Sequence, residues 1–148
     1  MNSRFAVAMH VLALLAIENK DEPTTSEYLA RSASTHPVVI RRILGTLRKA
    51  GLVTVQPGSR GGSSLARYPE LITLLEVYRA VGEGGLFSLG SRRPNPYCIC
   101  GRNIQPILAD VFCKAEKAVE ETLAGITVAQ LAQEIEESDA RSHRARKS

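Results

Sequence analysis

The stretch HPVVIRRILGTLRKAGLV, residues 36–53, has the pattern of one amphipathic helix that ends at a glycine. Pro37 suits the first position of a helix, and Gly51 suits the position after its C-terminus. The apolar residues that recur at the spacing i, i+3, i+4, i+7 are Ile40, Ile43, Leu44 and Leu47. This spacing predicts a helix over 37–51 that packs on a core through one face.

The opposite face of this helix is basic and contains a glycine. The residues on it are Val38, Arg42, Gly45 and Lys49, flanked by Arg41, Arg48 and Thr46. A glycine inside a helix costs about 1 kcal/mol relative to alanine, and a solvated surface gains nothing in return. In the major groove of DNA, a missing side chain lets the helix backbone approach closely. A basic face alone is equally typical of solvated surface, but the glycine favours a recognition helix.

The N-terminal segment is expected to be a buried helix over residues 3–19. Its apolar run, residues 5–17, is too short to span a bilayer and lacks the small-residue cleavage site of a signal peptide. Thr24 and Glu27 then have the spacing of a capping box that opens a short second helix. Together with residues 37–51, these segments give the order helix, helix, turn, helix.

Two short alternating segments follow, residues 52–56 and 63–67, on either side of the turn PGSRGG. Short β-branched runs around a Pro/Gly turn predict a β-hairpin. Three helices and a hairpin in this order are the winged helix-turn-helix arrangement. The expected fold class is therefore mainly α with a small β-hairpin, followed by a long C-terminal dimerisation helix.

The second half of the chain is expected to hold this long helix and to end in a tail. Thr73 and Glu76 predict a capped fourth helix, and Asn103 is expected to cap the long helix over 104–124. The expected divisions are a winged helix-turn-helix domain at 1–80, a Gly/Pro-rich connecting loop at 81–103, the dimerisation helix and a terminal helix at 104–137, and a disordered basic tail at 138–148.

Charge is distributed unevenly along the chain. Residues 1–67 hold 9 Lys/Arg against 4 Asp/Glu, whereas residues 68–140 hold 6 against 11. A basic front half joined to an acidic middle suggests that the front half binds a polyanion. Chance asymmetry of a solvated surface explains the same distribution, so the charge supports DNA binding only together with the helix pattern.

Each candidate DNA-binding residue has a role that follows from its position. Arg41 and Arg42 can reach base edges, and Val38 can pack on a thymine methyl. Residues near helix ends and at the hairpin turn suit phosphates or a minor groove. The full set is Thr25, Ser26, Val38, Arg41, Arg42, Gly45, Thr46, Arg48, Lys49, Arg60 and Gly61.

The motifs HPVVIRRILGTLRKAGLV, GSRGGSSLAR, ITLLEVYRAV and CICGRNIQPILADVF resemble those of the BadM/Rrf-two family of bacterial transcriptional regulators. The resemblance covers about residues 2–137. It implies a homodimer, paired through the long helices, that binds a palindromic operator and usually represses transcription. This chain departs from the family's pattern at Ser63, where the family often carries an aromatic residue after the two glycines.

The cysteines are a second departure. Iron–sulfur members of the family place three cysteines around the start of the long helix, whereas this chain has Cys98 and Cys100 and then Cys113. Cluster thiolates must converge on one small volume, and Cys113 is expected about 15 Å or more up the helix. No cofactor is therefore expected, with an iron–sulfur cluster and a reversible thiol switch as the alternatives.

The sequence as a whole predicts a sequence-specific DNA-binding transcriptional regulator. We expect a repressor that acts as a homodimer, through residues 104–125, on a palindromic operator. The alternative is a winged-helix module that binds protein or RNA. No set of nucleophile, base and orienting acid is present, so no enzyme is expected. Three cysteines without a disulfide framework indicate a reducing cytoplasm, and no membrane partner is expected; the sequence does not indicate the effector.

Overall fold

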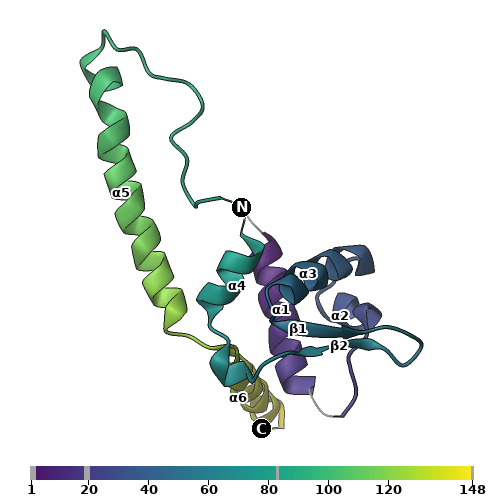
Figure 1. The fold of residues 1–148 in the computed structure, drawn as a ribbon. Helices are drawn as coiled ribbons and strands as arrows, with labels where there is room; N and C mark the ends of the chain where they lie inside the picture. The colour runs from purple at the N-terminus through teal and green to yellow at the C-terminus, as the bar shows by residue number, and fades with distance from the viewer. Residues whose placement is uncertain (1–2, 19–20, 83, 148) are drawn as a thin grey trace. The chain divides into compact units, whose positions relative to one another are not determined.

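The computed structural model describes residues 3–18, 21–82 and 84–147. Its elements are α1 (Ser3–Glu18), α2 (Ser26–Ser32), α3 (Pro37–Lys49), β1 (Val53–Gln56), β2 (Gly62–Leu65), the short 3-10 helix η1 (Pro69–Leu71), α4 (Leu74–Val81), α5 (Ile99–Ala124) and α6 (Val128–Lys147) (Figure 1). The chain forms two compact units, residues 1–82 with 124–148 and residues 83–123. The first unit confirms the predicted fold class, since it is mainly helical with one antiparallel hairpin.

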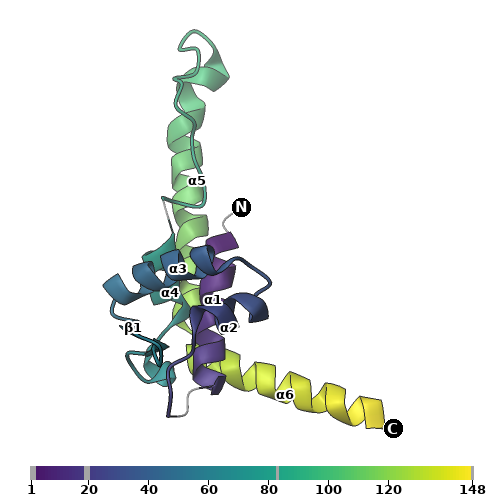
Figure 2. The same cartoon turned by 90° about the vertical axis from the view of Figure 1, so that its right-hand side faces the viewer.

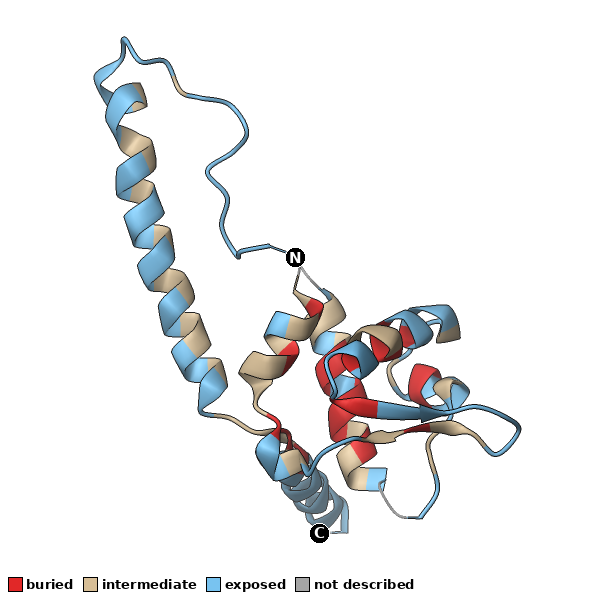
Figure 3. Ribbon diagram, viewed as in Figure 1, coloured by how far each residue is buried: buried red, intermediate tan, exposed pale blue. Residues whose placement is uncertain are grey.

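The core of the first unit surrounds α1. Six residues of α1 are buried, including Leu12 and Leu15, and α3 contributes the four residues of its predicted apolar face. Leu29, Val53 and Val77 bring in α2, the hairpin and α4. Figure 3 shows the buried residues gathered where these elements face one another. The i, i+3, i+4, i+7 pattern of residues 37–51 therefore predicted the correct face.

Replacing Leu47 by alanine is expected to destabilise the fold by about 2–5 kcal/mol, because a fully buried leucine leaves a cavity. Urea unfolding followed by circular dichroism would measure the loss. Leu71→Ala is the matched control, since Leu71 is 64% exposed and its truncation should change the stability by less than about 0.5 kcal/mol. Equal losses for both variants would contradict the assignment of Leu47 to the core.

The hairpin is held at two places. β1 and β2 pair antiparallel from Val53 opposite Leu65 to Gln56 opposite Gly62. Ser63 is also bridged to Thr24, with the Thr24 amide donating at 2.9 Å and the Ser63 amide donating at 2.7 Å. A Cβ atom at Gly62 would lie 2.5 Å from the Thr24 carbonyl oxygen, so this close approach requires a glycine. The bridge fixes the hairpin against the segment that leads into α2.

The start of α2 differs from the prediction. Thr25, not Thr24, is the N-cap, and its hydroxyl accepts from the Tyr28 amide at 3.2 Å. The Thr24 backbone is instead paired with Ser63, and the Glu27 carboxylate is paired with Arg41. The predicted Thr24–Glu27 capping box is therefore wrong, because tertiary partners use both residues.

The start of α4 agrees with the prediction. The Glu76 amide donates to the Thr73 hydroxyl at 3.2 Å, and the Thr73 amide donates to the Glu76 carboxylate at 3.1 Å, which completes the capping box. Arg67 also donates to this carboxylate. The Arg67 hydrogen bond, helped by the Thr73 amide and opposed by burial, holds the pKa of Glu76 below its ordinary value.

The long helix begins earlier than predicted. α5 starts at Ile99, and Asn103 lies inside it, where its side-chain amide donates to the Ile99 carbonyl at 2.7 Å. Asn95 forms the turn before the helix, because its side-chain oxygen accepts from the Tyr97 amide at 2.9 Å. The connecting loop therefore ends before residue 99 rather than at 103, and Pro106 lies within the helix.

The C-terminal segment is a helix rather than a disordered tail. α6 runs from Val128 to Lys147 and packs on α1 in the first unit, where Val128 and Ala132 are buried (Figure 2). The basic residues in its last turn match the negative end of the helix dipole. The sequence predicted one division for the long helix and the terminal helix. This grouping is wrong, because α6 belongs to the first unit. Among the residues described, no helix is long and apolar enough to cross a membrane.

Candidate nucleic-acid interface

The outer face of α3 is open. His36 caps the helix, since its Nδ1 atom accepts from the Val38 amide at 3.2 Å. Val38 is 44% exposed, and Arg42 and Lys49 are exposed beside it. A Cβ atom built at Gly45 meets nothing within 4 Å. We call Val38, Arg42, Gly45 and Lys49 the basic face.

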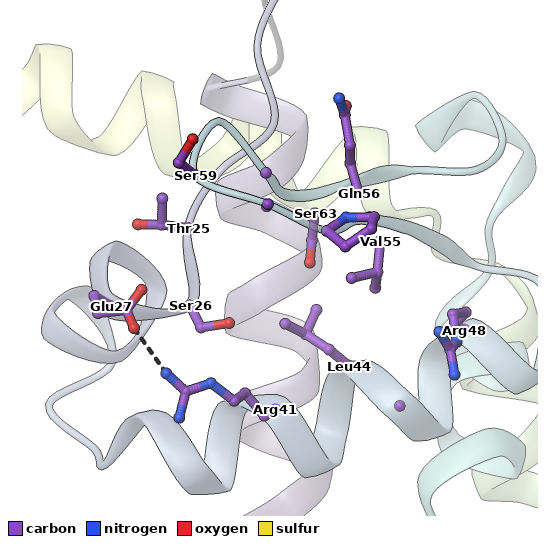
Figure 4. Close-up of a pocket in the computed structure, with 15 residues that line it drawn as sticks. Thr25, Ser26, Glu27, Arg41, Leu44, Arg48, Val55, Gln56, Ser59 and Ser63 are labelled. Atoms are coloured by element: carbon purple, nitrogen blue, oxygen red, sulfur yellow. Dashed lines mark hydrogen bonds and ion pairs between the residues drawn. The ribbon is translucent and has the colours of Figure 1, made fainter.

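A groove of about 450 Å³ runs beside the basic face. One wall is α3, and the others are the start of α2 and the turn between β1 and β2 (Figure 4). The predicted site residues that line it are Thr25, Ser26, Arg41, Gly45, Arg48 and Gly61. We call this hollow the recognition groove. It brings together predicted residues that lie up to 36 positions apart in the sequence.

The two arginines at the start of α3 have different surroundings. The Nη2 atom of Arg41 donates to the Oε1 atom of Glu27 at 2.7 Å, which ties α3 to α2 (Figure 4). Arg42 points from the basic face, and no side chain in the described ranges pairs with it. A guanidinium without an internal partner keeps all five N–H donors for a ligand.

The Thr46 hydroxyl already has two hydrogen-bond partners within the protein. Its hydroxyl donates to the Arg42 carbonyl at 3.2 Å and accepts from the Nη2 atom of Arg4 at 3.4 Å. Arg4 comes from α1, so a further basic side chain stands beside α3 that the sequence analysis did not include. Glu27, Gln56 and Ser59 also line the recognition groove and were not predicted.

The turn of the hairpin is compact. Its backbone closes through the Gly61 amide, which donates to the Gly58 carbonyl at 3.0 Å. A Cβ atom at Gly61 would lie 2.0 Å from the Gln56 carbonyl oxygen, so only glycine fits there. Arg60 is exposed in this turn. The turn therefore presents the Arg60 guanidinium next to the bare backbone of Gly61 and Gly62.

The three cysteines do not converge. All are exposed; Cys98 precedes α5, Cys100 lies in its first turn, and Cys113 lies 13 residues further on. At 1.5 Å per residue, this separates Cys100 from Cys113 by about 20 Å along the helix. Within residues 3–18, 21–82 and 84–147, no three His, Cys, Asp or Glu side chains could hold a metal ion. The cysteines of one protomer therefore do not fit an iron–sulfur cluster, which requires converging thiolates.

Cys98 has a distinct electrostatic environment nonetheless. Hydrogen bonds from the Gly101 and Cys100 amides lower the pKa of the Cys98 thiol, because they stabilise the thiolate. Lowered thiol pKa values are typical at helix N-termini.

A helical core whose third helix lies open beside a β-hairpin defines the winged helix-turn-helix class of DNA-binding protein. The chain belongs to the Rrf2 family, because its residues 1–134 match the family described as an iron-dependent transcriptional regulator. It is accordingly a DNA-binding transcriptional regulator and not an enzyme.

Individual relatives agree with this assignment. YwnA of Bacillus subtilis (strain 168), an HTH-type transcriptional regulator by name, is 43% identical over 84% of this chain and 90% of its own length. The crystal structure of a protein described as DNA-binding is 38% identical, with a TM-score of 0.69 over 87% of this chain and 98% of that chain. IscR of T. potens is 25% identical, with a TM-score of 0.71 over 93% of this chain and 89% of that chain.

Proposed function

We propose that this protein is a cytoplasmic repressor that binds a palindromic operator as a homodimer. The observation that carries the DNA-binding part is the open basic face of α3. Val38, Arg42 and Gly45 lie opposite the buried apolar face, and the rest of the described unit does not cover them. A helix that is anchored on one side and open and basic on the other can enter a major groove without rearrangement.

The proposed role of each residue follows from the part of the DNA that its side chain can reach. Arg42 is placed for a bidentate contact with a guanine edge, and Val38 for a thymine methyl. Arg48 and Lys49, at the other end of α3, are placed for phosphates, which set the register of the protein on the duplex. Thr25 and Ser26 at the start of α2, together with Arg60 in the hairpin turn, would contact the DNA backbone on either side of α3.

The homodimer is supported by the apolar surface of α5. No described residue of this 26-residue helix is buried. Even its large apolar side chains are open to water, since Ile107 is 63% exposed and Val111 is 51% exposed. Phe112 on the same helix stacks on Phe87, with 4.9 Å between the ring centres. An apolar stripe of this length is costly in water, and a second copy of α5 would cover it.

A dimer also supplies what one recognition helix lacks. Two-fold related helices read half-sites about 34–36 Å apart on a palindrome, so each half-site adds to the specificity of the other. A bound dimer over a promoter would block the polymerase. A duplex that the protein selects from a random library can be placed over a reporter promoter in cells. Expression of the reporter should then be lower when this protein is present.

The test is a selection from random duplexes followed by binding measurements. The protein should enrich a palindrome, and its log K should fall linearly with log salt, because phosphate neutralisation releases counterions. Analytical ultracentrifugation should give a dimer. Equal affinity for all duplexes, or preference for RNA, would instead support the winged-helix interaction module and overturn the proposal.

No resident cofactor is part of the proposal, although the family description names iron. An absorption spectrum of anaerobically purified protein tests this point directly. A featureless visible region is expected, because the cysteines of one protomer do not converge. Visible sulfide-to-iron charge-transfer bands would contradict this expectation.

A further inference from the structure

A carboxylate lies on the surface that the proposed function places against DNA. Glu27 is in the first turn of α2, is exposed, and lines the recognition groove with Ser26 and Arg41. A negative charge at this position repels phosphate, so it lowers the affinity for every duplex alike. Its presence in a groove of otherwise basic character therefore needs a reason other than attraction to a polyanion.

The reason is visible in its contact with Arg41. The Nη2 atom of Arg41 donates to the Oε1 atom of Glu27 at 2.7 Å, and the two side chains point toward each other from α3 and α2 (Figure 4). They remain 55% and 60% exposed, so the ion pair contributes little to the stability of the fold. Its main effect is on the conformation of Arg41.

A fixed arginine binds differently from a free one. An exposed arginine samples many rotamers, and a ligand that immobilises it must overcome that entropy. The hydrogen bond to Glu27 uses a single N–H donor of Arg41, and a guanidinium has five in a rigid fork. Arg41 can thus stay paired with Glu27 while its remaining donors contact a base. Arg42, which lacks such a partner in the described chain, would have to be ordered by the DNA.

We propose that Glu27 is a positioning residue that holds Arg41 in the orientation for base contact, and that it thereby sets the sequence specificity of the recognition groove. This inference rests on the proposed function. It predicts opposite effects on two quantities when Glu27 is changed. Affinity for unrelated DNA rises because a repelling charge is lost, while the preference for the correct sequence falls because Arg41 is released.

The experiment compares Glu27→Ala with Glu27→Gln. Glutamine keeps an acceptor oxygen at the same reach without the charge, whereas alanine removes both. The probes are the duplex that the wild-type protein selects from a random library and a base-shuffled duplex of equal length. Both variants should bind the shuffled duplex alike, about two- to threefold more tightly than the wild type. The ratio of selected to shuffled affinity should fall about tenfold for alanine and only about threefold for glutamine.

The same substitutions in an Arg41→Ala background identify the residue through which Glu27 acts. There, alanine and glutamine at position 27 should give equal ratios. Glu70→Gln is the matched charge control, since Glu70 is exposed on η1, outside the recognition groove. It should leave the ratio unchanged. Thermal unfolding of each variant confirms that the fold is intact.

Each other outcome overturns the inference. Equal ratios for Glu27→Ala and Glu27→Gln in the wild-type background would mean that only the charge matters. A tenfold fall for Glu27→Ala that persists without Arg41 would mean that Glu27 itself accepts from a base, as carboxylates do from cytosine. A wild-type protein that prefers no duplex would overturn the proposed function as well, whereas a clear wild-type preference that Glu27 does not affect would overturn this inference alone.

Discussion

Arg42→Ala is expected to remove most of the preference for the selected operator over shuffled DNA. A bidentate arginine–guanine contact discriminates by about 1–3 kcal/mol. Two copies in the proposed dimer double this loss, so the ratio of the two affinities should fall by a factor of about 30 to 10⁴. Arg42 is exposed and unpaired within the described chain, so the fold should be unaffected. Fluorescence anisotropy with both duplexes measures the ratio.

Lys49→Ala is the control for this prediction. Lys49 lies at the other end of α3 and is assigned to a phosphate. Its loss should weaken binding to both duplexes by the same factor and reduce the slope of log K against log salt by about 1 per contact. If Arg42→Ala also lowered both affinities equally, Arg42 would be a phosphate contact and not a base-reading residue.

The double variant Ile107→Asp, Val111→Asp is expected to convert the proposed dimer into monomers. These residues lie one helical turn apart on α5, and both are more than half exposed in the described chain. Two carboxylates on the apolar stripe would have to be buried without partners in the paired helices, which is strongly unfavourable. Loss of the second recognition helix should lower operator affinity by a factor of about 10²–10⁴.

Ultracentrifugation and anisotropy on this variant test the dimer together with its consequence for DNA binding. Lys117→Gln serves as the control, because Lys117 is exposed and, at 3.6 residues per turn, lies on the side of α5 away from the apolar stripe. It should leave both the mass and the affinity as they are. A double variant that remains dimeric would show that α5 does not pair the subunits.

Local patterns predicted α3 and its buried face. The apolar spacing of residues 37–51 and the terminal residues Pro37 and Gly51 are properties of one helix, so the sequence alone contains them. The hairpin and the Thr73 capping box are equally local. These features gave the fold class and the open basic face.

The features that the sequence analysis missed depend on residues far apart in the chain. Thr24 pairs with Ser63, which moves the start of α2 by one residue. Glu27 reaches Arg41 over 14 positions, and Arg4 reaches Thr46 over 42. No spacing rule connects such pairs, so the groove's internal ion pair could not be predicted.

Two helix boundaries were missed for a different reason. Asn103, as a helix cap, suggested a helix start near residue 104, whereas the turn at Asn95 starts α5 earlier. The polarity of residues 138–148 suggested disorder, although an acidic residue four positions before a basic one, as in Glu137 and Arg141, suits a helix. In both cases the local sequence also contains a signal for the observed helix.

The central claim is that the basic face of α3 lies in a major groove, and Gly45→Leu tests it most directly. The free protein has open space at this position, and leucine is a better helix former than glycine by nearly 1 kcal/mol. The variant should therefore unfold at a higher temperature than the wild type, yet lose operator binding because its side chain keeps the helix backbone away from the bases. Unchanged operator affinity in a stabilised Gly45→Leu variant would contradict the claim.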